Sequence, residues 1–224
     1  MSQDPDICIR GAGIVGQTLA LLLARERLRV GLVRPAAAAR GSDVRAYALS
    51  AASKALMQSL RVWPEAQQAT PVRQMRICSD AGARVQFSAE ELDVPALAWI
   101  VDVGALEDRL AQAVAFQSLI EPLSTPRDAA LTVVCEGRAS RSRAEFGVSY
   151  SITPYAQTAI ATRLLCERAH AQVAYQWFHK GEILAFLPLG GEPGNCVAVV
   201  WSVPTQRAAD LMGLEPAAFA QELQ

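Results

Sequence analysis

Short apolar runs and one long helical pattern alternate in the first part of the chain. Residues 6–10 and 28–34 are predicted to be short strands, and residues 14–27 carry helix formers with apolar side chains all round. Glycines separate the first strand from the helix. A strand, a glycine-rich turn, a helix and a strand in this order predict a strand–helix–strand unit with two parallel strands. A loop is predicted to follow at residues 35–43.

The remainder of the chain mixes helical periodicity with strand-like alternation. Ser50 is a predicted N-cap for a helix at residues 51–60. A loop is predicted at residues 190–194, between the last two strands. The predicted strands are residues 72–80, 83–89, 129–137, 171–178, 182–189 and 195–202, and the predicted helices are residues 103–114, 205–214 and 216–224. The chain therefore predicts an α/β fold in which a nucleotide-binding type of domain is interleaved with a mainly antiparallel β-sheet domain.

Composition narrows the function classes. The 224 residues are 51% hydrophobic with a net charge of −1, so no basic surplus indicates a nucleic-acid partner. Five scattered cysteines and only two histidines predict neither a disulfide framework nor a metal site. The acidic start and the short uncharged apolar run at residues 11–24 predict no leader and no membrane span. We expect a reduced, cytoplasmic protein, with peripheral attachment to a membrane left open.

Three glycines carry the clearest chemical signal. Gly11, Gly13 and Gly16 form a G-x-G-x-x-G motif between a predicted strand and a predicted helix. In this context the first glycine allows a sharp turn, the second allows a pyrophosphate to approach, and the third allows close packing of helix and strand. Arg34 ends the second strand, where an acid would bind a ribose. By itself, an arginine at this position favours the 2′-phosphate of NADP.

The segment DVRAYALSAASKALMQSLRVWP at residues 43–64 resembles the flavin-dependent aromatic hydroxylases of ubiquinone biosynthesis, which are similar to p-hydroxybenzoate hydroxylase. Residues 155–190 also match that family's pattern, as do MRICSDAG, WIVDVGALEDRL and NCVAVVWSVP, so that nearly the whole chain is covered. The residues that match the family's R-x-x-A-L-S and L-x-x-W patterns are Arg45, Ala48, Leu49, Ser50, Leu60 and Trp63.

The resemblance implies an FAD-dependent monooxygenase that uses NAD(P)H and O2 to hydroxylate a prenylated phenol or a related aromatic compound. It implies a Rossmann-like FAD-binding domain at residues 1–70 and 99–163, and a substrate domain at residues 71–98 and 164–224. Arg45 is then expected near the flavin and its phosphates. The flavin carries the oxygen chemistry, so the sequence identifies no catalytic residue.

Three features depart from the family pattern. Arg34 takes the place of the acid that binds the ribose. In the family's second motif, G-A-D-G-x-x-S, Val134 replaces the first glycine and Glu136 replaces the aspartate, whereas Gly137 and Ser140 are kept. The stretch before this motif is shortened. The family's G-D-A-A-H segment, which contacts FAD, is not found, so a shortened member is expected. We therefore expect this chain by itself to retain FAD weakly and not to hydroxylate.

Two other functions stay open at this stage. The altered FAD contacts are also expected of a non-catalytic paralogue that binds other proteins of the ubiquinone pathway. Arg34 leaves an NADP-binding reductase as a further alternative. His170 is a candidate base, although a polar histidine at a strand edge is the commoner situation.

Overall fold

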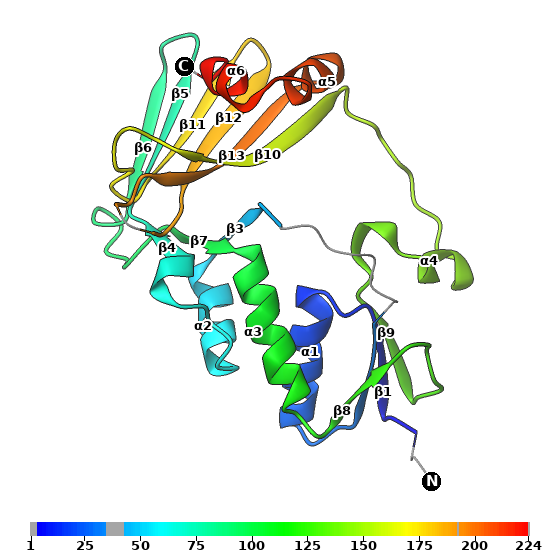
Figure 1. Cartoon of the computed structure of the whole chain (residues 1–224). Helices are drawn as coiled ribbons and strands as arrows, with labels where there is room; N and C mark the ends of the chain where they lie inside the picture. The colour runs from blue at the N-terminus through cyan, green and yellow to red at the C-terminus, as the bar shows by residue number, and fades with distance from the viewer. Residues whose placement is uncertain (1–3, 35–42, 192, 224) are drawn as a thin grey trace. The chain divides into compact units, whose positions relative to one another are not determined.

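The chain folds into two compact units (Figure 1). The computed structural model describes residues 4–34, 43–191 and 193–223. Unit one consists of Met1–Asp43, Ala52–Pro64 and Val103–Ser151, and unit two consists of Val44–Ala51, Glu65–Asp102 and Ile152–Gln224. The chain passes repeatedly from one unit to the other, which confirms the predicted interleaving of two domains. The predicted loop at residues 35–43 lies, except for Asp43, outside the described residues.

The bounds of the two units differ from the predicted domain bounds. The predicted changes of domain at 70/71, 98/99 and 163/164 each fall inside a strand, namely β4 (Ala69–Val72), β7 (Ala98–Asp102) and β10 (Gln157–Leu165). Each of these strands is paired with others of unit two along its length, so each belongs entirely to that unit. The assignment of FAD to unit one and of substrate to unit two stays a prediction.

Unit one is built around a four-stranded parallel sheet with the strand order β8-β2-β1-β9. Its strands are β1 (Ile7–Arg10), β2 (Val30–Val33), β8 (Ile120–Leu123) and β9 (Leu131–Val134). Strands β1 and β2 are apolar and almost completely buried, as expected of parallel strands. The predicted strand–helix–strand unit is therefore confirmed, whereas the short strand β8 was not predicted.

The helices of unit one include a packed pair. Helix α1 (Ile14–Arg25) packs against α3 (Val103–Ala115), which buries Leu106 and Leu110 at helical spacing. The other helices are α2 (Ala51–Ser59), of which Ala51 belongs to unit two, η2 (Gly137–Ala139) and α4 (Ser142–Glu145). Helix α2 begins directly after Ser50, so the predicted helix is confirmed. The capping role of Ser50 stays a prediction.

Unit two contains a six-stranded sheet in the order β10-β13-β12-β11-β5-β6. All pairs are antiparallel except β11 with β5. The strands are β5 (Gln74–Ser79), β6 (Arg84–Ser88), β10, β11 (Val173–His179), β12 (Glu182–Pro188) and β13 (Cys196–Pro204). A three-stranded antiparallel sheet, in the order β3-β7-β4 with β3 at Ala46–Leu49, completes the unit with η1 (Ala66–Gln68). Five of the six strands in the larger sheet were predicted, and β10 was not.

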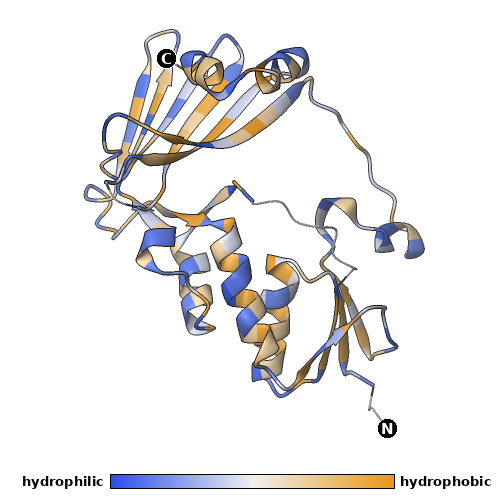
Figure 2. Cartoon of the chain, viewed as in Figure 1, coloured by the Kyte–Doolittle hydropathy of each residue, from blue (hydrophilic) through white to orange (hydrophobic). Residues whose placement is uncertain are grey.

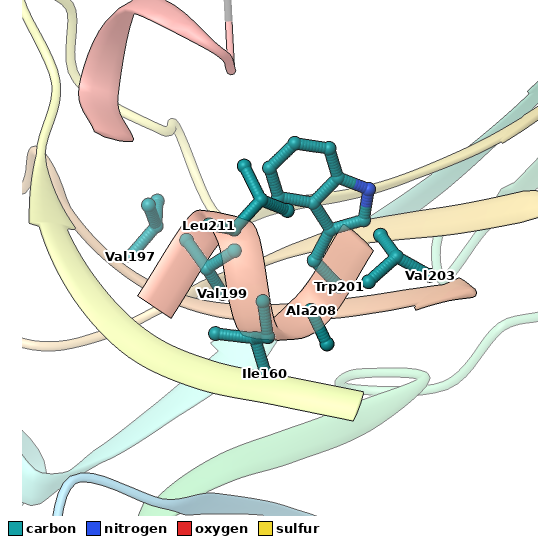
Figure 3. Close-up of a cluster of buried hydrophobic side chains, with 7 residues drawn as sticks. All are labelled: Ile160, Val197, Val199, Trp201, Val203, Ala208 and Leu211. Carbon is teal, nitrogen blue, oxygen red and sulfur yellow. The ribbon is translucent and has the colours of Figure 1, made fainter. Parts of the chain in front are cut away.

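One face of the six-stranded sheet packs against helices. Helices α5 (Thr205–Met212) and α6 (Pro216–Gln221) confirm the two predicted helices. Trp201 and Val199 of β13, Ile160 of β10 and Leu211 of α5 belong to one buried cluster, part of which Figure 3 draws. Figure 2 shows hydrophobic residues, in orange, along the strands, and a mixture of hydrophobic and hydrophilic residues in α5 and α6. No helix in the described part of the chain has the length and apolar character to cross a bilayer.

Candidate functional site

The glycine motif forms the turn between β1 and α1, as predicted. Gly11–Gly13 connect Arg10, the last residue of β1, to Ile14, the first residue of α1, and Gly16 lies in the first turn of the helix. A Cβ on Gly11, whose φ is +110°, would lie 2.5 Å from the carbonyl oxygen of Cys135. A Cβ on Gly16 would lie 1.8 Å from the carbonyl oxygen of Gly11. Both positions therefore require glycine for packing.

Gly13 differs from the other two glycines. A Cβ there would meet no heavy atom within 4 Å, so the backbone faces open space. Gly13 is also the N-cap of α1, and no side chain caps this helix end. The first turn of α1 contains no acidic residue. Free N–H groups and the positive end of the helix dipole are therefore available to an anion.

A second loop lies beside the glycine turn. It follows β9, the parallel neighbour of β1, and the N–H of Cys135 donates a 2.7 Å hydrogen bond to the carbonyl of Arg10. In this loop the Glu136 carboxylate accepts hydrogen bonds from Ser140 Oγ (2.7 Å), Ser142 N (3.0 Å) and Ser142 Oγ (2.9 Å). Burial by itself would raise the pKa of Glu136, but these hydrogen bonds outweigh it and lower the pKa to about 2.

The two loops border an open pocket of about 450 Å³ at the carboxyl edge of the parallel sheet. Gly137 lies on its wall with a φ of +66° and open space at its Cβ position. Burial raises the pKa of the Cys135 thiol, which is therefore a neutral, weakly polar part of the wall. The residues that line the pocket are Val15, Val134, Cys135, Glu136, Gly137, Ser140 and Arg143.

Arg34 lies at the same edge of the sheet. Its backbone N–H donates a 2.9 Å hydrogen bond to the carbonyl of Leu123, directly after β2, and its side chain is exposed. Because β2 is paired with β1, Arg34 follows the strand next to the one that ends in the glycine turn. The structure therefore brings Gly11, Gly13, Gly16, Glu136, Gly137 and Arg34 to one edge of unit one.

Arg45 belongs to unit two and is exposed. Its guanidinium carbon lies 6.0 Å from the centroid of the Tyr47 ring, and its backbone carbonyl accepts a 3.5 Å hydrogen bond from Arg163 Nη2. Its predicted contact with a flavin stays a prediction.

His170 has a structural role in the turn before β11. Its Nε2 lies 2.8 Å from the carbonyl oxygen of Leu189, and its Nδ1 accepts a 3.0 Å hydrogen bond from the N–H of Gln172. Because Nδ1 accepts from Gln172, Nε2 is the ring nitrogen that donates to the Leu189 carbonyl. Both ring nitrogens are therefore engaged by backbone groups, one in this turn and one directly after β12, which favours a structural role for this histidine over a catalytic one.

Arg10 and Ser142 were not among the residues predicted from the sequence. Arg10 Nη1 donates a 2.9 Å hydrogen bond to Ser142 Oγ and forms an ion pair with Glu145. Ser142 is 1% exposed and also contacts Glu136, so it joins the two loops. The sequence does indicate that Arg10 has a partner, because an arginine at the end of an otherwise apolar buried strand needs a group of opposite charge.

Comparison with solved structures defines the class of fold. The chain superposes on PqsL of Pseudomonas aeruginosa, described as a probable FAD-dependent monooxygenase, with a TM-score of 0.78 and 20% identity over 98% of this chain and 66% of that one. It also matches p-nitrophenol 4-monooxygenase PnpA of Pseudomonas putida with a TM-score of 0.71 and 12% identity over 100% of this chain and 62% of that one. The fold is therefore that of FAD-dependent monooxygenases.

Curated relatives have a more specific description. The chain is 28% identical to 3-demethoxyubiquinol 3-hydroxylase of Escherichia coli, over 99% of this chain and 63% of the relative. It is 26% identical to ubiquinone hydroxylase UbiL of Rhodospirillum rubrum, over 98% of this chain and 56% of the relative. No protein-family model matches the chain. The resemblance to ubiquinone-pathway hydroxylases is thereby confirmed, and this chain spans less than two thirds of the length of either relative.

Proposed function

We propose that this chain is an FAD-dependent aromatic hydroxylase of the ubiquinone-biosynthesis type, with unit one holding the ADP half of FAD. The observation that carries the proposal is the glycine turn at the carboxyl edge of the parallel sheet. There the uncapped N-terminus of α1 and the open space at Gly13 meet the pocket beside Glu136 and Gly137. Dinucleotides bind at this edge in sheets of this kind.

The residues of the site fit a pyrophosphate. The N–H groups in the first turn of α1 would donate to its oxygens, and the absence of a side chain on Gly13 would let it approach the backbone. Gln17 is 3% exposed, and its Nε2 donates a 3.1 Å hydrogen bond to the carbonyl of Ala12. This contact holds the turn in shape without a ligand, so little ordering would be needed on binding.

Glu136 and Gly137 contribute in different ways to this proposal. The Glu136 carboxylate is occupied by Ser140 and Ser142, so its role is to shape the loop. Gly137 adopts a left-handed backbone conformation next to open space, so its backbone can approach the cofactor. Arg34 places a cation where FAD proteins of this type place a ribose acceptor, and we expect it to weaken the ribose contact.

Bound FAD, reduced by NAD(P)H, would supply the oxygen chemistry, as flavins do in monooxygenases. The chain itself would bind FAD and the aromatic substrate and orient them relative to each other. Arg45, which is exposed before β3, is proposed to contact the flavin or its phosphates, as in the family that the chain resembles.

Unit two offers an apolar surface that suits a prenylated phenol. The six-stranded sheet has two faces, and α5 and α6 cover one of them. The side chains on the other face come from every second residue of each strand. Part of this opposite face, including Ala174 and Ala198, packs against Val72 and Ile100 of the three-stranded sheet. Elsewhere on this face, apolar side chains remain exposed: Val85 (51%), Phe87 (44%), Phe178 (39%) and Val200 (37%).

Exposed apolar residues that gather on one sheet face indicate a binding surface. A prenyl tail has the matching chemistry, and two of the relatives are described as ubiquinone hydroxylases. We therefore propose that the substrate is an aromatic compound with a prenyl chain, bound through this face of the sheet.

Equilibrium titration with FAD tests the proposal. Quenching of flavin fluorescence should saturate at one FAD per chain, and ADP should compete with FAD. With excess FAD present, we expect this chain by itself to bind FAD without turnover. NAD(P)H oxidation that is stimulated by a prenylated phenol, with a product heavier by one oxygen atom, would show instead that the chain hydroxylates by itself. The absence of saturable FAD binding would contradict the proposal, and tighter binding of NADP than of FAD would favour a reductase.

A further inference from the structure

We propose that Arg10 is a positioning residue that fixes the loop Glu136–Phe146 against the end of β1 and thereby shapes the site for the ADP half of FAD. This inference rests on the function proposed above. Arg10 does not need to touch the ligand. Its side chain is directed to the loop, and its effect on binding is transmitted through Ser142 and Glu136.

The Arg10 side chain is committed to this loop by three contacts. Nη1 donates to Ser142 Oγ at 2.9 Å and forms an ion pair with Glu145, and the guanidinium carbon lies 5.3 Å from the centroid of the Phe146 ring. The Arg10 side chain is 18% exposed and Ser142 is 1% exposed, so water screens this hydrogen bond less than it would at the surface. The Glu145 side chain is 57% exposed, so the ion pair is more strongly screened. We call the set formed by Arg10, Ser142 and Glu145 the latch.

The latch is connected to the wall of the pocket through Ser142. The Ser142 hydroxyl accepts from Arg10 and donates to Glu136 Oε1, and the Ser142 backbone N–H donates to Glu136 Oε2. Glu136 precedes Gly137, and both line the pocket. Displacement of Ser142 would therefore remove two of the three hydrogen bonds that hold the carboxylate shaping the wall and leave only that from Ser140 Oγ.

The backbone supports the same conclusion. The carbonyl of Arg10 accepts a 2.7 Å hydrogen bond from Cys135, and Gly11 leaves room for only a hydrogen atom against the Cys135 carbonyl. These contacts hold the beginning of the loop against the glycine turn. The latch holds the loop ten residues farther along, at Glu145. The intervening segment, with Gly137 and Ser140, is thus anchored at both ends.

A direct role for Arg10 in binding phosphate predicts a different response to mutation. If Arg10 bound the pyrophosphate, Glu145 would compete for it, and Glu145→Gln would strengthen ADP binding. If Arg10 acts through the latch, Glu145→Gln weakens the latch and ADP binding falls. The same substitution thus gives opposite results for the two roles.

The experiment uses the 224-residue chain with ADP as the probe, because ADP carries the pyrophosphate and no flavin. Isothermal titration should show that Arg10→Met weakens ADP binding by about tenfold or more, as expected when charge-assisted hydrogen bonds are lost. Glu145→Gln should weaken it in the same direction by a smaller factor. The double variant should be no weaker than Arg10→Met, because both substitutions break one latch.

Limited digestion with trypsin reports on the loop without any ligand. Arg138 and Arg141 are exposed within it. Cleavage there under native conditions should be about tenfold faster in Arg10→Met, because local opening becomes easier. Arg29→Met is the matched control, since Arg29 pairs with Asp6 at 2.7 Å near the other end of β1. It should change neither the cleavage of this loop nor the affinity for ADP.

The outcomes of these experiments test the latch and the proposed dinucleotide-binding function separately. A wild-type chain that binds no ADP would contradict the proposed function and, with it, the effect of Arg10 on affinity. Equal rates of loop cleavage in wild type and both latch variants would overturn the latch itself. Tighter ADP binding by Glu145→Gln would also overturn it and assign Arg10 to the phosphate. If Arg10→Met does not fold, Glu145→Gln decides the question alone.

Discussion

The Glu136 carboxylate gives the sharpest prediction about stability. Glu136→Gln keeps the size of the side chain and removes its charge. An amide has one acceptor oxygen in place of two, so one of the donors, Ser140 Oγ, Ser142 N or Ser142 Oγ, faces an NH2 group. We expect the variant to fold with a loosened loop after β9.

The magnitude follows from the pKa. Hydrogen bonds lower the pKa of Glu136 from its ordinary value of 4.5 to about 2. At about 1.4 kcal/mol per pKa unit, that difference corresponds to an upper limit of roughly 3 kcal/mol. Glu136 is partly exposed, so solvent screening reduces the expected contribution to about 1–2 kcal/mol. For a chain of this size the loss lowers Tm by about 2–8 °C.

The dependence on pH makes this prediction specific. Since the pKa is lower in the folded state, the ionised carboxylate stabilises the fold fully above about pH 4.5, and this contribution disappears as the pH falls towards 2. The Tm difference between wild type and Glu136→Gln should therefore be largest at pH 7 and should shrink by about half or more at pH 3. Thermal unfolding followed by circular dichroism at both pH values measures it.

Glu26→Gln is the control for this experiment. Glu26 is an exposed carboxylate at the end of α1, in the same unit, and its substitution should change stability by less than about 0.5 kcal/mol. A Tm difference for Glu136→Gln that is absent at pH 7, or that is the same at pH 7 and pH 3, would show that the Glu136 carboxylate does not stabilise the fold through these hydrogen bonds.

Three further predictions concern the glycine turn and Arg34. Gly11→Ala should lower Tm by several degrees, because its Cβ would lie 2.5 Å from the Cys135 carbonyl oxygen at a positive φ; an unchanged Tm would contradict the packing described. Gly13→Ala should leave Tm within about 2 °C and weaken ADP binding by about tenfold, and unchanged affinity in calorimetry would argue against pyrophosphate at Gly13. Arg34→Glu should raise FAD affinity by roughly tenfold in fluorescence titrations, whereas weaker binding would speak against a ribose contact there.

Much of unit one could be predicted from local sequence, because its signals are strong over short distances. The glycine spacing, the buried strands on either side and the helix formers of α1 all indicate one arrangement, and the structure has it. Strand β8 was missed because only four residues pair there and the strand contains Pro122. Its place in the sheet depends on pairing with β2, which local sequence does not specify.

In unit two, the predictions failed where pairing over long distances determines the structure. Strand β10 carries the run TAIATRLL, whose alanines are poor strand formers. It is nevertheless a strand, because all nine residues pair with β13, about forty residues farther along the chain. The predicted domain bounds were displaced for the same reason, since they divided strands whose partners lie far away in the sequence.

At the candidate site, the sequence identified the glycines, Glu136 and Gly137 but not how they are held. The contact between Arg10 and Ser142 spans 132 residues, and no local pattern indicates it. The roles proposed for Arg34 and Arg45, and the expectation that this chain by itself retains FAD weakly, stay predictions.

The most direct test of the central claim locates the dinucleotide on the protein. Two-dimensional 1H–15N NMR spectra of the labelled chain, recorded during titration with ADP, report on each backbone amide separately. We expect saturable shifts concentrated at Gly11–Gly16 and at Glu136–Ser140, with amides of the six-stranded sheet unaffected. Shifts that gather elsewhere, or the absence of any saturable shift at high ADP concentration, would contradict a dinucleotide site at the glycine turn.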